Sequence, residues 1–158
     1  QEASLVEAKL WRVNLKSSYL QYANLYKIQL FRADLSYANL LGANLVSSYL
    51  EEARLEKANL EYTQLKNANL NKANLKNANL TRAYLKNAKL HKANLQGVVF
   101  YEANMKRARL YGADLTNTIG LNQSMINSAF GDLTTKLPSD LTYPKSWIDH
   151  VWQDEEEE

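Results

Sequence analysis

Few residues of this sequence could carry out catalysis, and none belongs to a recognisable catalytic motif. The only histidines, His91 and His150, lie far apart, without a second ligand at the spacing of a zinc-binding helix. The chain has no cysteine, no glycine-rich phosphate loop and no G-x-S-x-G motif. The adjacent acids Glu51 and Glu52 could serve as an acid–base pair, but we interpret them as solvated surface charges. We therefore predict that the protein is not an enzyme and holds no metal or cofactor.

Basic residues offer a second kind of chemistry, the binding of anions. No acidic residue lies between Glu61 and Glu102, and seven bases do. The candidate anion-binding residues are Lys66, Lys72, Lys76, Arg82, Lys86 and Lys92. Three interpretations stay open: a solvated face, a contact with the acidic "DEEEE" end of this chain or of a neighbour, and a site for nucleic acid or lipid headgroups. Nucleic acid is the less favoured partner, because the aromatic residues that would stack on bases lie mostly earlier in the chain.

The element that positions these residues is a five-residue repeat, plainest in "ANLNKANLKNANL". Counting by five from Leu5 to Leu115 gives 23 units, of which 21 are centred on Leu and the others on Phe100 and Met105. Ala stands two residues before the centre in 17 units, and Asn or Asp lies between them in 12. The pattern runs through residues 3–117 without an insertion.

A period of five fits neither regular secondary structure. In an α-helix successive Leu side chains would spiral around the axis, and in a flat strand they would alternate between faces. A solenoid with one pentapeptide on each side instead points every Leu and Ala inward, with Asn and Asp at the bends. Among the expected core residues are Leu25, Leu45, Leu65, Leu85, Phe100 and Met105.

Units such as "ADLSY", "ANLLG" and "ANLQG" resemble the A(D/N)LXX motif of the pentapeptide-repeat family. The resemblance covers about three quarters of the chain, residues 3–117 of 158. It implies an all-β fold, a right-handed quadrilateral β-helix with 20 residues per coil. Twenty-three repeats would make about six coils, roughly 27 Å long at the spacing of paired strands.

In that register, residues 20 apart stack above one another, which brings aromatic side chains together. Trp11 lies beneath Phe31, Tyr26 occupies a neighbouring column, and Leu41 faces outward. We predict a protein interface at Trp11, Tyr26, Phe31 and Leu41, since exposed apolar patches with Trp and Tyr mark interaction sites. The alternative is that stacked aromatics only stabilise adjacent strands.

Residues 118–150 break the pattern and are predicted to cap the last coil. A short helix is expected to begin at Asn122 and end near Gly131, and the capping residues would be Met125, Ile126, Phe130 and Trp147. A similar ending follows the repeats in many bacterial members of the family. Residues 151–158 form an acidic tail that we expect to be disordered.

The first coil has no equivalent cap in the sequence. A leader that has been removed, a second copy of the chain or another partner could cover it. The sequence contains no stretch resembling a transmembrane segment. The compartment stays open, either the cytoplasm or, after export with loss of a leader, the periplasm or a lumen.

The leading hypothesis is a structural or interaction module, of bacterial or cyanobacterial type, that binds an unidentified protein partner. Some members of the family that confer quinolone resistance mimic DNA with a strongly acidic surface and bind topoisomerases. Here the repeat region, residues 1–117, has 17 Lys and Arg against 9 Asp and Glu, so that activity is the less favoured alternative.

Overall fold

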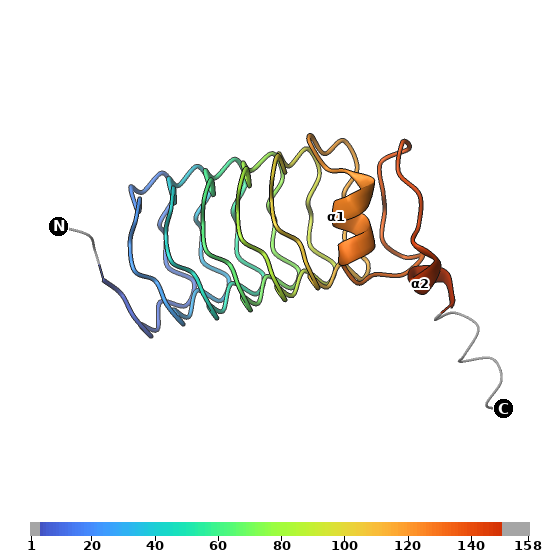
Figure 1. Ribbon diagram of the computed structural model, residues 1–158. Coiled ribbons are helices and arrows are strands. Elements are labelled where there is room, and N and C mark those ends of the chain that lie inside the picture. The colour runs from blue at the N-terminus through green and yellow to red at the C-terminus, as the bar shows by residue number, and fades with distance from the viewer. Residues whose placement is uncertain (1–3, 150–158) are drawn as a thin grey trace, which may run out of the picture.

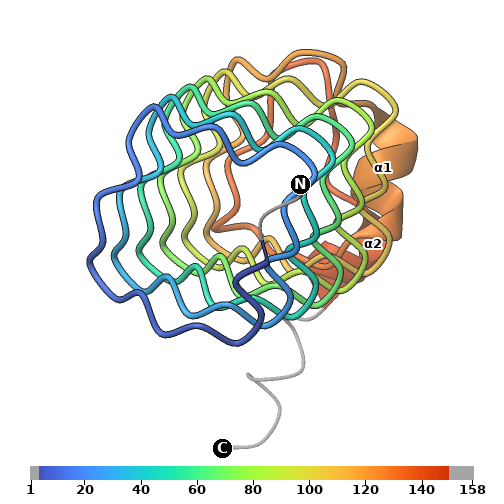
Figure 2. The same cartoon turned by 90° about the vertical axis from the view of Figure 1, so that its left-hand side faces the viewer.

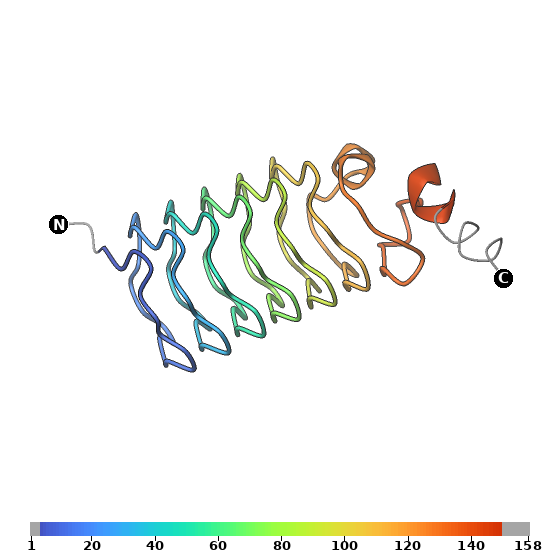
Figure 3. The same ribbon diagram turned by 90° about the horizontal axis from the view of Figure 1, so that it is seen from below.

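The computed structural model describes residues 4–149. The chain winds into a stack of similar turns, with its two ends at opposite ends of the stack (Figure 1). Seen along the axis, successive turns superimpose as one closed outline (Figure 2). Two short helices, α1 (Gln123–Ser128) and α2 (Lys145–Ile148), lie at the C-terminal end of the stack (Figure 3).

Parallel pairing between residues 20 apart defines the coil. Single-residue bridges recur every five residues, from Ser4 with Asn24 to Val99 with Ile119, so each 20-residue coil has four sides. The pairing is too brief at each side for a continuous strand. On each side the Leu N–H donates to the next coil, as from Leu65 to the Tyr84 carbonyl at 2.9 Å. The N–H four residues later donates backward, as from Asn69 to the Ser48 carbonyl at 2.8 Å.

A tight turn separates one side from the next. Ala68 N–H donates to the Leu65 carbonyl at 3.1 Å, and the third residue of this turn, Asn67, has a φ of 60°. The same left-handed conformation recurs at equivalent corners, including many Lys and Arg residues that have no intrinsic preference for it. The pairing above and below holds these residues in place.

The inward Leu and Ala residues form one continuous core. From Ala23 to Leu115 these positions are almost all completely buried, among them Leu25, Leu45, Leu65, Leu85, Phe100 and Met105. Leu5, Leu10, Leu15 and Leu20 of the first coil are only partly buried, because no coil lies above them among the described residues.

Pairing with the stack continues past residue 117. Ile119 pairs with Val99, Phe130 with Arg109 and Lys136 with Asp114. On the fourth side, where a partner for Asn104 would follow, the chain enters α1 instead. The Asn122 side chain caps α1 by accepting from Met125 N–H at 3.0 Å.

The C-terminal segment differs in part from what the sequence predicts. Ile126 and Trp147 are buried, Met125 packs on the core, and the Trp147 indole donates to the Ala129 carbonyl at 3.1 Å. However, α1 ends at Ser128, short of Gly131, and Phe130 is 43% exposed. The prediction that Phe130 covers the core is therefore wrong, because its backbone pairs with Arg109 and its side chain points outward. The predicted tail, residues 151–158, lies outside the described residues.

Candidate functional site

One side of the stack carries the most distinctive surface. We call it the Tyr49 side, after its central column of bridged residues, Lys9, Gln29, Tyr49, Asn69, Lys89 and Arg109. Two hollows described below lie along it, one near each end. From Gln29 to Arg109 each residue of the column is held by backbone pairing above and below, so its side chain projects from a fixed point.

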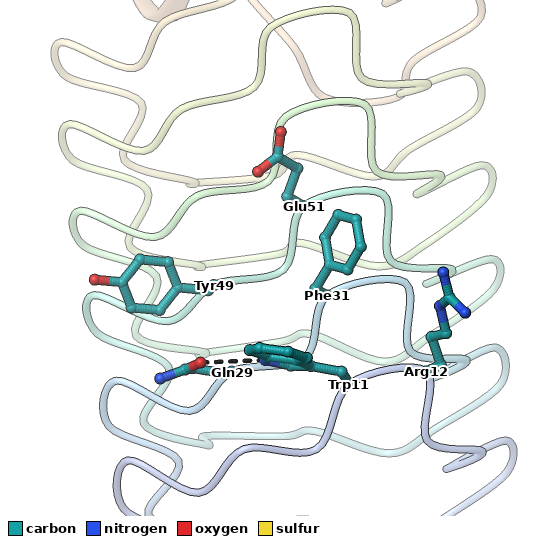
Figure 4. A pocket seen from close by; sticks show the side chains of 6 residues that line it. All are labelled: Trp11, Arg12, Gln29, Phe31, Tyr49 and Glu51. Carbon is teal, nitrogen blue, oxygen red and sulfur yellow. Dashed lines mark hydrogen bonds between the residues drawn. The ribbon is translucent and has the colours of Figure 1, made fainter.

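The first hollow, the aromatic groove, has a volume of about 900 Å³. Its lining residues are Trp11, Arg12, Gln29, Phe31, Tyr49 and Glu51. Figure 4 shows Trp11, Phe31 and Glu51 on successive coils, with Gln29 and Tyr49 beside them. Trp11 is 62% exposed and its indole N–H donates to Gln29 Oε1 at 3.1 Å. Three aromatic rings on rigid backbone thus border one concave surface.

Charged residues surround the groove in distinct ways. The Arg32 guanidinium lies over the Phe31 ring, 4.9 Å from its centre, and also contacts Glu52 at 2.6 Å. Glu51 accepts from the Asn69 amide at 3.5 Å, and within residues 4–149 it forms no ion pair. The Arg32 contact orients Phe31, and the groove keeps an acidic edge at Glu51.

The predicted interface is only half assembled by the structure. Trp11 and Phe31 share the groove, but Tyr26 lies beneath Lys27 at an earlier corner and Leu41 lies on another side of the coil. Sequence reasoning missed Tyr49, which replaces Asn within its repeat. That replacement is the signal that could have identified it.

Replacement of Asn is concentrated on the Tyr49 side. In the central column only Asn69 keeps the Asn or Asp of the repeat, whereas five of six residues do so in the column Asn14, Asp34, Arg54, Asn74, Asn94 and Asp114. The Asn or Asp that stabilises the corner is therefore absent most often on the side that carries the two hollows.

The predicted anion-binding residues do not form one patch. Counted in steps of 20, Lys66 and Lys86 share one corner, Lys72 and Lys92 the next, and Lys76 and Arg82 each occupy another. Lys72 contacts Glu52 at 3.8 Å. Arg82 pairs with Glu102 at 2.8 Å and also donates to the Tyr62 hydroxyl. These six residues are dispersed, because a stretch of sequence winds around all four sides, and their role in anion binding stays a prediction.

A smaller set of bases does come together in the second hollow, the basic hollow, of about 440 Å³. Its lining residues are Asn67, Asn87, Lys89, Arg107, Arg109 and Phe130. Burial lowers the pKa of nearby His91, and the charges of Arg109 and Lys89 lower it further, against an opposite effect of Asp132. With three bases and no acid among its lining residues, the hollow carries a net positive charge.

The catalytic candidates are separated by the fold. Glu52 pairs with Arg32, whose hydrogen bond lowers the pKa of that carboxyl, while Glu51 faces the aromatic groove. His91 packs its ring against Tyr111 with centres 5.1 Å apart. Within residues 4–149 no three His, Asp or Glu side chains cluster as metal ligands, and His150 lies outside that range.

Comparison with known sequences identifies the repeat. A profile of the family described as pentapeptide repeats matches in 8 copies, with matched stretches spanning residues 1–117. The chain belongs to the pentapeptide-repeat family. A search of curated proteins gives no significant match. In residues 4–149 of this pentapeptide-repeat protein, neither helix has the length and apolar character that crossing a bilayer requires.

Several pentapeptide-repeat proteins of known structure are similar to this chain. Rfr23 from the cyanobacterium Cyanothece 51142 is 29% identical, with 89% of this chain and 91% of Rfr23 covered and a TM-score of 0.46. HetL, involved in heterocyst differentiation regulation in the cyanobacterium Nostoc sp. strain PCC 7120, is 22% identical, with 91% and 92% covered and a TM-score of 0.36. The plasmid-mediated fluoroquinolone resistance protein QnrB1 is 15% identical, with 98% and 97% covered and a TM-score of 0.27.

Proposed function

We propose that this pentapeptide-repeat protein is a non-enzymatic interaction module that binds a protein partner through the aromatic groove. The observation that supports this most is that Trp11, Phe31 and Tyr49 all line one hollow of about 900 Å³. Trp and Tyr contribute most to the energy of protein interfaces, because they bury large areas and lose little side-chain entropy.

The backbone beneath the groove favours tight recognition. Leu10 N–H donates to the Gln29 carbonyl at 2.8 Å, and Leu30 N–H to the Tyr49 carbonyl at 2.8 Å, so these bonds join the successive coils that carry the groove. A preformed surface pays little ordering entropy on binding. The partner should present an apolar anchor to the rings, with a donor or cation toward Glu51.

The composition of the repeat region speaks against the DNA-mimic alternative. A polyanion mimic needs an acidic surface, and residues 1–117 have eight more basic than acidic side chains. The six ion pairs among residues 4–149 also place five of the eight acids of residues 4–117 against Lys or Arg rather than in an uncompensated acidic stripe.

Site-specific photo-crosslinking tests the proposal. A photoreactive phenylalanine analogue at Tyr49 should crosslink a defined protein from a native lysate, and the same analogue at Tyr84, on another side, should not. In affinity capture, a Trp11→Ser/Phe31→Ser variant should lose that protein, with affinity reduced by about 30-fold or more, as for interface hot spots.

The matched control is Tyr19→Ser/Tyr22→Ser, which removes two exposed aromatics of the first coils from other positions. It should retain the partner. Equal capture by the two double variants, or crosslinking from Tyr84 as strong as from Tyr49, would contradict the assignment to the groove.

A further inference from the structure

Three cationic side chains, Lys89, Arg107 and Arg109, line the basic hollow, and its lining residues include no acid. Lys89 and Arg109 are bridged neighbours in one column, about one strand spacing apart, and Arg107 lies at the corner two residues before Arg109. None of the three forms an ion pair within residues 4–149, although six other bases do. Like charges directly opposite on paired strands are destabilising. An anion placed among them would relieve that repulsion.

The backbone fixes where these cations emerge. Lys89 N–H and Arg109 N–H donate to the carbonyls of Ala68 and Ala88, both at 2.9 Å, and Arg107 N–H donates to the Ser128 carbonyl at 2.7 Å. The charges are therefore held together by paired backbone rather than by a mobile loop. A bound anion would not have to order the chain.

Two neutral residues of the lining, Asn67 and Asn87, stack with Arg107 at one corner. Asn87 Nδ2 donates to Asn67 Oδ1 at 3.1 Å, which orients the amide of Asn67 with its own N–H groups still available. Two guanidinium groups, an ammonium and an amide together match the acceptor oxygens of phosphate, and Arg binds such oxygens in bidentate fashion.

The dimensions favour a small ligand over a polymer. The hollow of about 440 Å³ is within the usual range of small-molecule sites. The column continues from Lys89 through the neutral residues Asn69, Tyr49 and Gln29, so the column itself is not the continuous row of cations that a nucleic-acid track would require. At the other edge the exposed ring of Phe130 offers a surface on which a planar group could stack.

We propose that the basic hollow binds a small ligand with two or more adjacent phosphate groups, such as a nucleoside diphosphate, held by Lys89, Arg107 and Arg109. Lys66, Lys86 and Lys106 stack along the preceding corner, where they add to the positive field and attract the ligand. The site is distinct from the aromatic groove and does not depend on it.

Calorimetric titration with pyrophosphate and with ADP tests this proposal. Wild type should bind both with a Kd between roughly 10 µM and 1 mM at low salt. Lys89→Gln/Arg109→Gln should weaken binding by about 10-fold or more, since it removes two charge-assisted contacts. Phe130→Ser should weaken ADP and leave pyrophosphate unchanged.

The control Lys57→Gln/Lys76→Gln removes the same charge at a different corner and should bind as wild type does. Trp11→Ser/Phe31→Ser should also bind normally, which separates this site from the proposed partner interface. An equal loss of affinity in Lys89→Gln/Arg109→Gln and in Lys57→Gln/Lys76→Gln would mean that the anions are attracted non-specifically, and it would overturn the proposal. So would the absence of pyrophosphate binding at concentrations up to about 10 mM.

Two further probes distinguish the source of the phosphate. Vesicles containing phosphoinositide should bind no better than uncharged vesicles, and a single-stranded oligonucleotide should bind no better than ADP. Binding of vesicles or oligonucleotide without binding of pyrophosphate or ADP would overturn the assignment to a small ligand.

Discussion

The Asn of a repeat stabilises the corner that follows it, so a repeat without Asn lacks that stabilisation. Its side chain accepts a hydrogen bond from the N–H two residues later, as Asn59 Oδ1 does from Glu61 at 3.1 Å. Such a bond closes the corner and contributes about 0.5 to 1.5 kcal/mol. On the Tyr49 side, Asn69 accepts from Asn71 at 3.1 Å, while Tyr49 and Arg109 have no carboxamide to do so. Their side chains do not stabilise the corner in this way, which leaves them free to serve the binding that we propose.

We predict that Tyr49→Asn stabilises the protein while weakening partner binding. Glu51 N–H has no hydrogen-bond partner among residues 4–149, and an Asn at position 49 would supply one. Tyr49 is 53% exposed, so its loss leaves little unfilled space. The free energy of unfolding should rise by about 0.5 to 1 kcal/mol in urea denaturation.

Tyr84→Asn is the control, because it should stabilise similarly through Lys86 N–H without affecting capture of the partner. Destabilisation by Tyr49→Asn would show that the tyrosine has a packing role. The hypothesis that Tyr49 serves binding at the expense of stability would then be wrong.

At this scale the sequence predicts much of the interior and less of the surface. The five-residue spacing identifies the inward residues, because burial follows directly from the period. It cannot show that Tyr49 joins Trp11 and Phe31, since side chains in different columns meet only through the shape of the corner between them. Nor does it show that Lys72 and Arg82 are neutralised by Glu52 and Glu102.

At the scale of the elements, hydrogen bonds and an ion pair to the Asp114 carboxylate hold the C-terminal segment against the last coil. Asp114 accepts from Thr116 Oγ1 at 2.7 Å, Gln96 at 3.0 Å and Lys136 at 3.4 Å, and its backbone pairs with Lys136. Partial burial by itself would raise the pKa of Asp114, but the hydrogen bonds from Thr116, Gln96 and Lys136 outweigh it and lower the pKa. The ionised carboxylate therefore stabilises the folded junction.

We predict that Asp114→Asn destabilises the protein by about 1 kcal/mol at pH 7, where the wild-type carboxylate is charged. A lowered folded-state pKa contributes stability that is present above the unfolded-state pKa, near 4, and is lost as the pH falls through the folded value. The difference between wild type and variant in urea denaturation should therefore diminish steadily below about pH 4.

An Asp140→Asn variant, which removes an exposed acid, controls for net charge. A destabilisation by Asp114→Asn that stays constant from neutral to acid pH would mean that size or geometry, rather than charge, fixes the junction.

The C-terminal elements were less predictable than the coils. Asn122 and the run after it predict a helix start, and the structure has one. The structure has a shorter α1 than the sequence predicts, because Phe130 pairs with Arg109, its N–H donating to the Ala108 carbonyl, rather than continuing the helix. The local sequence does not indicate that pairing with the neighbouring coil is preferred over another turn of helix.

For the whole molecule, the two ends of the stack differ in how they are covered. The last coils pair with residues 119–136, whereas the N–H groups of Lys9, Asn14 and Tyr19 have no partner among residues 4–149. Stability in a solenoid spreads between neighbouring coils, so a coil with one neighbour is held less firmly. Such an edge could also pair with a second copy of the chain, as the sequence suggested.

We predict that the first coil exchanges its amide hydrogens much faster than the middle of the stack. Leu10 and Leu70 both donate at 2.8 Å to the following coil, yet Leu10 is only partly buried. In dilute solution the Leu10 amide should exchange at least about 100-fold faster, because local opening of an end coil costs less. Protection of Leu10 that increases with protein concentration would indicate self-association at this edge. Equal protection of the Leu10 and Leu70 amides at every protein concentration would contradict the prediction.

Because each coil has four sides, a change in the number of pentapeptides rotates one surface of the stack relative to another. Gain or loss of one pentapeptide between Tyr49 and Lys89 would leave every Leu inside, yet it would rotate all later residues by a quarter turn. The basic hollow would then lie around the corner from the aromatic groove. Only changes of 20 residues, the separation of the paired positions, keep both on the same side and alter the distance between them alone. The distance and the relative orientation of two binding surfaces can thus be set independently of the core.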